Sequence, residues 1–174
     1  KGGENPTVTD ADLALGYIIY KVARKRLGSV PAVALAGLYL LNPATLVNTA
    51  AWGQIDSLLA LVVVAYLWFL YERKIVWASV LFILGALIKP QMLLFGPVLL
   101  VVFIHFWMEQ GWKKALRAFA ISVVSGLALA AAVVLPFRQG QDFWWIIDKY
   151  TGTMGFYRFT SLSACNVYGL MGLF

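Results

Sequence analysis

A short polar segment between two long apolar runs carries side chains well suited to binding a hydroxyl-rich ligand. Its polar and aromatic residues are Asn48, Trp52, Gln54 and Asp56. Amide and carboxylate groups hydrogen-bond hydroxyls, and an indole ring offers a flat face for stacking. A structural role is the alternative, because Asp56 and Ser57 stand where an acidic residue or a cap favours a helix N-terminus. Trp52 would then lie at a membrane interface.

A second polar group, Lys89-Pro90-Gln91, interrupts apolar sequence. Pro90 ends the preceding run, since proline cannot continue a helix. That run has about 14 residues and reaches ~21 Å, so Lys89 should lie below the surface of a hydrocarbon core ~30 Å thick. A cation at that depth is costly unless it faces a polar cavity or a partner, and it suits a phosphate or diphosphate ligand. The alternative is a lysine that snorkels to the interface.

Asp12 and the aromatic segment 137–166 complete the candidate set. Asp10 and Asp12 stand at the start of the first apolar run. We expect Asp10 to cap that helix, and Asp12 to serve either the site or the positive end of the helix dipole. The segment 137–166 combines several Trp, Tyr and Phe residues with Arg158 and Asn166. Such aromatic residues form either an interfacial belt or, beside Arg and Asn, a carbohydrate or lipid-phosphate site.

Other kinds of site have no sequence signature. His105 has no partner at metal-ligand spacing, and we assign no metal ligand in the sequence. No glycine-rich phosphate loop and no Ser-His-Asp pattern is readable. Cys165 is the one cysteine, so no disulfide can form within the chain, and we interpret it as a structural thiol.

Apolar sequence surrounds these polar positions and must position them. The chain is 61% hydrophobic and 13% charged, with a mean hydropathy of +0.79. A soluble chain with so few charges could not cover its core, so we predict an all-α, polytopic transmembrane helix bundle. We expect about six membrane helices, with short or broken helices at the outer face. They are 11–23, 30–41, 55–71, 75–88, 91–107 and 118–137.

Loop charge alternates along the chain and predicts an orientation. Nine Lys and Arg residues share one set of loops with two Glu residues, whereas the other set holds five bases and six acids. The positive-inside rule puts the basic clusters at 21–26, 73–74 and 113–117 in the cytoplasm, and the N-terminus and the site outside. This topology explains the net charge of +6 better than nucleic-acid binding does.

We expect the 174 residues to form a single transmembrane domain, residues 1–174, within a longer protein. The chain has no initiating Met, and it ends just as an apolar run begins.

The motifs resemble those of a known family. The segment NPATLVNTAAWGQIDSLLAL followed by ALIKPQMLLFGPVLL resembles the bacterial relatives of the GPI-anchor second mannosyltransferase, within the GT-C class of polytopic glycosyltransferases. The acidic opening and basic ending of TDADLALGYIIYKVARKRLG and the tail TSLSACNVYGLMG are similar too. W-G-Q-x-D with K-P-Q is the most specific part of the resemblance, which covers nearly the whole chain.

The resemblance implies a membrane mannosyltransferase that moves a sugar from a polyprenyl-phosphate donor to a glycan, lipid or protein acceptor on the non-cytoplasmic face of the cell membrane. Lys89 would bind the donor phosphate, while Gln54, Asp56 and Gln91 would hold sugar hydroxyls. The family's catalytic Asp follows the first helix, in a part that we expect to lie outside this sequence. The general base is therefore unassigned, with Asp56 and Asp12 as candidates.

Two other classes remain open on the sequence alone. A transporter or channel subunit with an outward polar cavity also has broken helices and intramembrane charge, although the chain shows no internal repeat. A structural membrane subunit would not need polar outer segments. No cofactor is implied besides the lipid-linked donor, and a divalent-metal requirement stays open.

Overall fold

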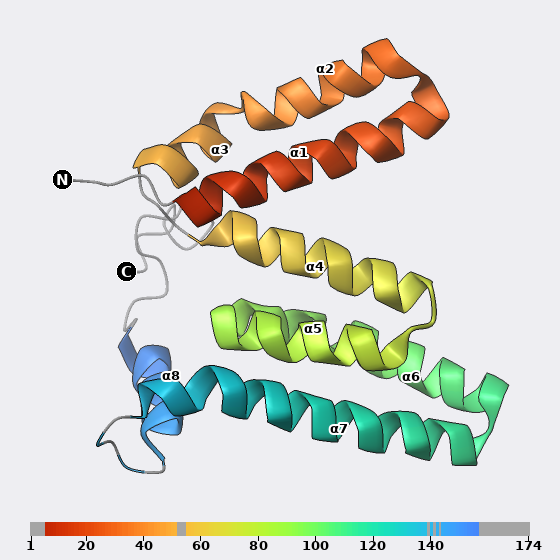
Figure 1. The fold of residues 1–174 in the computed structure, drawn as a ribbon, viewed down its shortest axis with the longest axis vertical. Helices are drawn as coiled ribbons and strands as arrows, with labels where there is room; N and C mark the ends of the chain where they lie inside the picture. Colours follow the sequence, from red (N-terminus) through yellow and green to blue (C-terminus); the bar gives the residue numbers. More distant parts are fainter. Residues whose placement is uncertain (1–5, 52–54, 139, 141, 143, 157–174) are drawn as a thin grey trace, which may run out of the picture. The chain divides into compact units, whose positions relative to one another are not determined.

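The computed structural model describes residues 6–51, 55–138, 140, 142 and 144–156. Every regular element in this part of the chain is a helix, as predicted (Figure 1). The chain divides into two compact units, Lys1–Ala131 and Ala132–Phe174. In the second unit, the end of α7 leads into a 3₁₀ turn, η3 (Leu135–Phe137), and the short helix α8 (Trp145–Phe156) follows.

The helices of the first unit follow the predicted apolar runs. They are α1 (Pro6–Leu27), α2 (Ser29–Leu40), α3 (Pro43–Leu46), the π-helix η1 (Val47–Ala51), α4 (Asp56–Tyr71), α5 (Ile75–Ile88), the 3₁₀ helix η2 (Pro90–Phe95), α6 (Gly96–Gln110) and α7 (Trp112–Val134). Helices α1 and α7 extend beyond their predicted runs by several polar residues. Hydropathy marks the apolar stretch of a helix, not the turns that continue it into water.

Two helical stretches of the described chain, Pro90–Gln110 and Trp112–Phe137, are long and apolar enough to cross a membrane. A third span results if Ser29–Leu40 and Pro43–Thr49, which are bent by 44°, act as one broken helix. Helices α4 and α5 are apolar but shorter, with 16 and 14 residues. Large apolar side chains such as Leu38, Val101 and Leu127 remain exposed, and surface of this kind suits lipid better than water.

Consecutive long helices of the first unit run in opposite directions (Figure 1). Gly28 and Gly111 adopt φ angles of 85° and 81°, which let the chain reverse tightly after α1 and α6. The end of α1, the α4–α5 turn and the α6–α7 turn therefore lie at one end of this unit (Figure 1). These are the three segments that carry the basic clusters, so we call this the basic end.

The buried core joins α4, α5 and η2. Tyr66 and Met92 are fully buried, and Tyr66 Oη donates a 2.9 Å hydrogen bond to the Phe95 carbonyl. Met92 fits because Gly85 has no side chain: a Cβ there would lie 2.7 Å from Met92 Cγ. This close approach holds η2 against α5, and it fixes the reversal of the chain at Lys89.

Candidate functional site

Lys89 stands at the reversal between α5 and η2. Its backbone is extended, with φ −154° and ψ 128°, and Pro90 follows as the first residue of η2. Proline disfavours a helical conformation for the residue before it, so Lys89-Pro90 breaks the helix where the sequence predicted. With 14 residues, α5 reaches ~21 Å from the basic end.

Asp56 accepts the charge of Lys89. Lys89 Nζ donates to Asp56 Oδ1, and the two side chains are 27% and 40% exposed. Asp56 is the first residue of α4, and because α4 and α5 are antiparallel neighbours, the start of one meets the end of the other. The N-cap position of α4 is Ile55, so neither Asp56 nor Ser57 is the cap. Asp56 is the acidic residue of the first turn, as the structural alternative predicted, and its carboxylate also pairs with a cation from another helix.

Asp12 forms a second polar group at the same end of the unit. It is 6% exposed. Tyr39 Oη donates to its Oδ1 at 2.8 Å, and Thr49 Oγ1 donates to its Oδ2 at 2.5 Å. A buried carboxylate needs such donors, and these come from α2 and η1. Asp10 and Asp12 both lie inside α1, so the expectation that Asp10 caps this helix is wrong.

The two polar groups approach each other through Tyr39. Ser57, which follows Asp56 on α4 and is buried, is close enough to interact with the Tyr39 hydroxyl. The starts of α1 and α4 and the end of α2 lie at the same end of the unit, opposite the basic end (Figure 1). We call this the polar end. It brings acids, hydroxyls and one amine together from helices that are distant in sequence.

The break at Asn42-Pro43 directs the chain across the polar end. Asn42 Oδ1 accepts a 2.9 Å hydrogen bond from the Ala44 amide and so caps α3. The π-helix η1 follows and carries Asn48, which is half-buried, beside Thr49. Single π turns occur often at functional sites, because their altered register turns side chains to a new direction.

Some predicted site residues are not described in the structure. Trp52, Gln54, Arg158 and Asn166 lie outside the described residues. Gln91 is exposed on η2, two positions after Lys89. Sequence reasoning missed Tyr39 and Thr49, since a hydroxyl in an apolar run carries no sign of which acid it will meet. In the described part of the chain, no three His, Cys, Asp or Glu side chains gather as a metal site would require.

A known protein family matches nearly the whole chain. The model of glycosyltransferase family 87 matches residues 10–170. The chain belongs to this family. The resemblance to polytopic glycosyltransferases in the sequence motifs is thereby confirmed at the level of the family. No solved structure matches this family 87 chain.

Two fungal relatives carry a more specific name. The chain is 35% identical to GPI mannosyltransferase 1 of Aspergillus fumigatus over 89 residues, which are 50% of this chain and 21% of that protein. It is 31% identical to GPI mannosyltransferase 1 of Aspergillus oryzae over 102 residues, 58% of this chain and 23% of that protein. The matched segments thus span under a quarter of these relatives. Neither relative is bacterial or carries the name of the second GPI mannosyltransferase.

Proposed function

We propose that this family 87 chain is part of a membrane mannosyltransferase that takes its sugar from a polyprenyl-phosphate donor and works on the non-cytoplasmic face. The observation that carries the proposal is the Lys89–Asp56 pair at the polar end, at the helix break formed by Lys89-Pro90. A lipid-linked donor must present its phosphate at the edge of the hydrocarbon, and a partly buried ammonium is suited to meet it there.

The orientation follows from loop charge. The three basic clusters gather at the end opposite the Lys89–Asp56 pair (Figure 1). Because short cytoplasmic loops collect Lys and Arg, the basic end faces the cytoplasm in this proposal and the polar end faces outward. The proposal includes all six predicted membrane passes. Helices α4 and α5 are short, so they would cross with their polar ends inside the outer half of the bilayer.

Transfer would break the bond between sugar C1 and the phosphate oxygen, and the phosphate would leave with the bonding electrons. The ammonium of Lys89 would stabilise the charge that develops on this leaving group. An acceptor hydroxyl would form the new bond to C1 and give its proton to a base. In the free protein Asp56 holds Lys89 in position, and in the complex the donor phosphate would share or replace that contact.

Asp12 has a positioning role in this scheme and is a poor base. Both of its oxygens already accept hydrogen bonds, from Tyr39 and Thr49. Asp12 would hold η1, and with it Asn48, against α1. Asp56 and Gln91 lie near Lys89, and both would bind sugar hydroxyls. The chemistry of their side chains assigns Trp52 and Gln54 to the sugar, and Arg158 and Asn166 to the sugar or the lipid phosphate. The acceptor remains a glycan, a lipid or a protein.

The test is a transfer assay on the full-length protein in proteoliposomes with two radiolabelled donors, polyprenyl-phosphate mannose and a nucleotide-linked mannose. A membrane extract supplies the acceptors. The proposal expects label to move from the lipid-linked donor and not from the nucleotide sugar. Transfer only from the nucleotide sugar would contradict the donor class. Uptake of a solute without any transfer would favour a transporter.

A further inference from the structure

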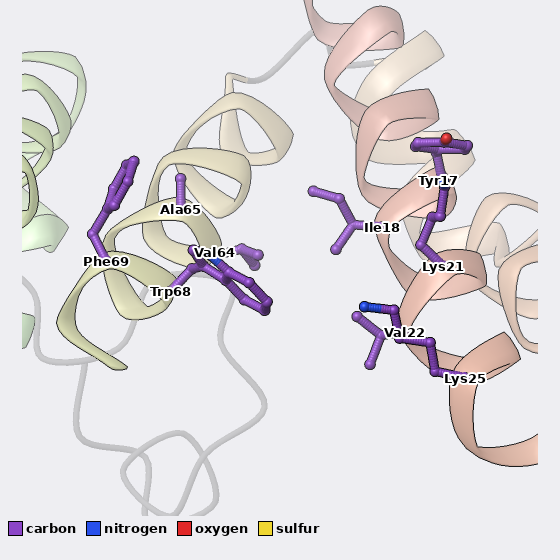
Figure 2. A pocket seen from close by; sticks show the side chains of 9 residues that line it. All are labelled: Tyr17, Ile18, Lys21, Val22, Lys25, Val64, Ala65, Trp68 and Phe69. Carbon is purple, nitrogen blue, oxygen red and sulfur yellow. The ribbon is translucent and has the colours of Figure 1, made fainter. Parts of the chain in front are cut away.

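A groove of about 430 Å³ lies between α1 and α4, away from the polar end. Its walls are apolar: Ile18 and Val22 of α1 stand opposite Val64 and Trp68 of α4 (Figure 2). The two helices lie close together at the polar end and diverge toward the basic end (Figure 1). The groove occupies the space that this divergence leaves.

The groove runs from the basic end along α1 and α4. Lys25 lies two residues before the end of α1, and Tyr17 lies ten residues before it, which is ~15 Å along the axis. Phe69 and Trp68 of α4 stand near the same end, close to Tyr71, the last residue of that helix. The groove therefore extends from the basic end along both helices, and in a membrane its apolar walls would lie at acyl-chain depth.

Two lysines line the groove, Lys25 near the end of α1 and Lys21 one turn farther from that end. Lys21 Nζ stands 5.4 Å from the centre of the Tyr17 ring, and Lys25 reaches from α1 toward α4 (Figure 2). Among the described residues no carboxylate forms an ion pair with either lysine. At the α4–α5 turn, by contrast, Arg73 pairs with Glu109 and Lys74 pairs with Glu72.

We propose that this groove binds one anionic phospholipid of the leaflet at the basic end. Its head-group phosphate would contact Lys25 and also Lys21, once the Lys21 side chain turns from the Tyr17 ring toward the basic end. An acyl chain would lie against Ile18, Val22, Val64 and Trp68. Cations without protein counter-charges at membrane-surface depth attract anionic lipids, and basic pockets between membrane helices bind their head groups. The long lysine side chains also reach the interface from within the bilayer. This lipid site is separate from the Lys89–Asp56 pair. The proposal depends on the membrane placement of the bundle and not on the proposed sugar donor.

The test measures which lipids the full-length protein retains. The protein is reconstituted in nanodiscs of phosphatidylcholine and phosphatidylglycerol with identical acyl chains, and retained lipid is identified by native mass spectrometry. The double variant Lys21→Gln, Lys25→Gln should lose the enrichment of phosphatidylglycerol, by roughly fivefold for each lysine. The matched control is Lys113→Gln, Lys114→Gln, which removes the same charge from the same end without touching the groove, and it should keep the enrichment.

A third variant separates the groove from surface charge. Ala65→Trp fills the groove without changing charge, and it should lower the retention of both lipids. Equal loss of phosphatidylglycerol in both lysine pairs would overturn the proposal in favour of general electrostatic attraction. Unchanged enrichment in Lys21→Gln, Lys25→Gln would also overturn it. Unchanged lipid retention in Ala65→Trp would also overturn the proposal, because filling the groove would then displace no lipid.

Discussion

Lys89 and Asp56 are 33 residues apart in the sequence and form an ion pair where the end of α5 meets the start of α4. Lys89 owes its position to Pro90, which ends α5, and Asp56 owes its position to the antiparallel packing of α4 on α5. Both side chains retain partial exposure. A pair of this kind is accessible to a ligand that offers a competing negative charge.

The energetic coupling of this pair is our first prediction. Lys89→Met should leave the Asp56 carboxylate without its cation, and Asp56→Asn should do the reverse. Because both groups are partly exposed, we expect a coupling energy of only about 1 kcal/mol in a double-mutant cycle of unfolding. Thermal or denaturant unfolding of the two single variants and the double variant in detergent gives the value. Strict additivity would mean that the two side chains do not interact in the folded protein.

The hydroxyl partners of Asp12 give the second prediction. Tyr39→Phe and Thr49→Val each remove one donor from a buried carboxylate, which should cost about 1–3 kcal/mol of folding free energy. Asp12→Asn should destabilise the protein to a similar degree, because an NH2 group, which donates, would replace one of the two oxygens that accept from Tyr39 and Thr49. The loss of sugar transfer should follow the loss of folded protein. Full stability of Asp12→Asn with no transfer would instead make Asp12 a catalytic residue.

The third prediction concerns the packing that fixes the reversal at Lys89. Gly85→Ala puts a Cβ 2.7 Å from Met92 Cγ, and such overpacking should destabilise the fold by about 1–3 kcal/mol. It should also weaken donor binding, because η2 and Lys89 must shift. Gly37→Ala is the matched control: nothing lies within 4 Å of a Cβ there, and alanine is the better helix former by about 1 kcal/mol. Equal effects of the two substitutions would contradict this packing account.

Membrane topology is the fourth prediction. Single cysteines in the loops at 21–29, 71–74 and 108–117 should resist labelling by an impermeant thiol reagent applied from outside intact cells, since positive clusters are retained in the cytoplasm. A cysteine at Gln91 should react when the reagent is applied from outside. Labelling of the basic loops from outside would reverse the orientation and, with it, the proposed side of the reaction.

The breaks in the helices could be predicted from sequence, because proline acts locally. Lys89-Pro90 ends α5 as expected, and Asn42-Pro43 stands directly after the predicted run 30–41. The need of Lys89 for a polar partner could also be predicted, because an unpaired cation at membrane depth is costly. The choice of Asp56 over Asp12 depends on which helices are neighbours.

Contacts made across helices could not be predicted in this way. Asp12 is 27 residues from Tyr39 and 37 from Thr49, and only the packing of α1 against α2 and η1 brings these groups together. The capping role expected for Asp10 was wrong because α1 includes the polar residues before the apolar run. The groove between α1 and α4 could not be predicted either, because residues of both helices line it.

Donor affinity of Lys89→Met in the full-length protein tests the central claim most directly. Binding of polyprenyl-phosphate mannose to proteoliposomes should weaken by at least about tenfold, a loss of ~1.4 kcal/mol, while Lys89→Arg should recover only part of it because a planar guanidinium presents its charge differently. Lys74→Met removes the same charge at the basic end and should bind the donor normally. An unchanged affinity in Lys89→Met, with the protein folded, would contradict the phosphate role of Lys89.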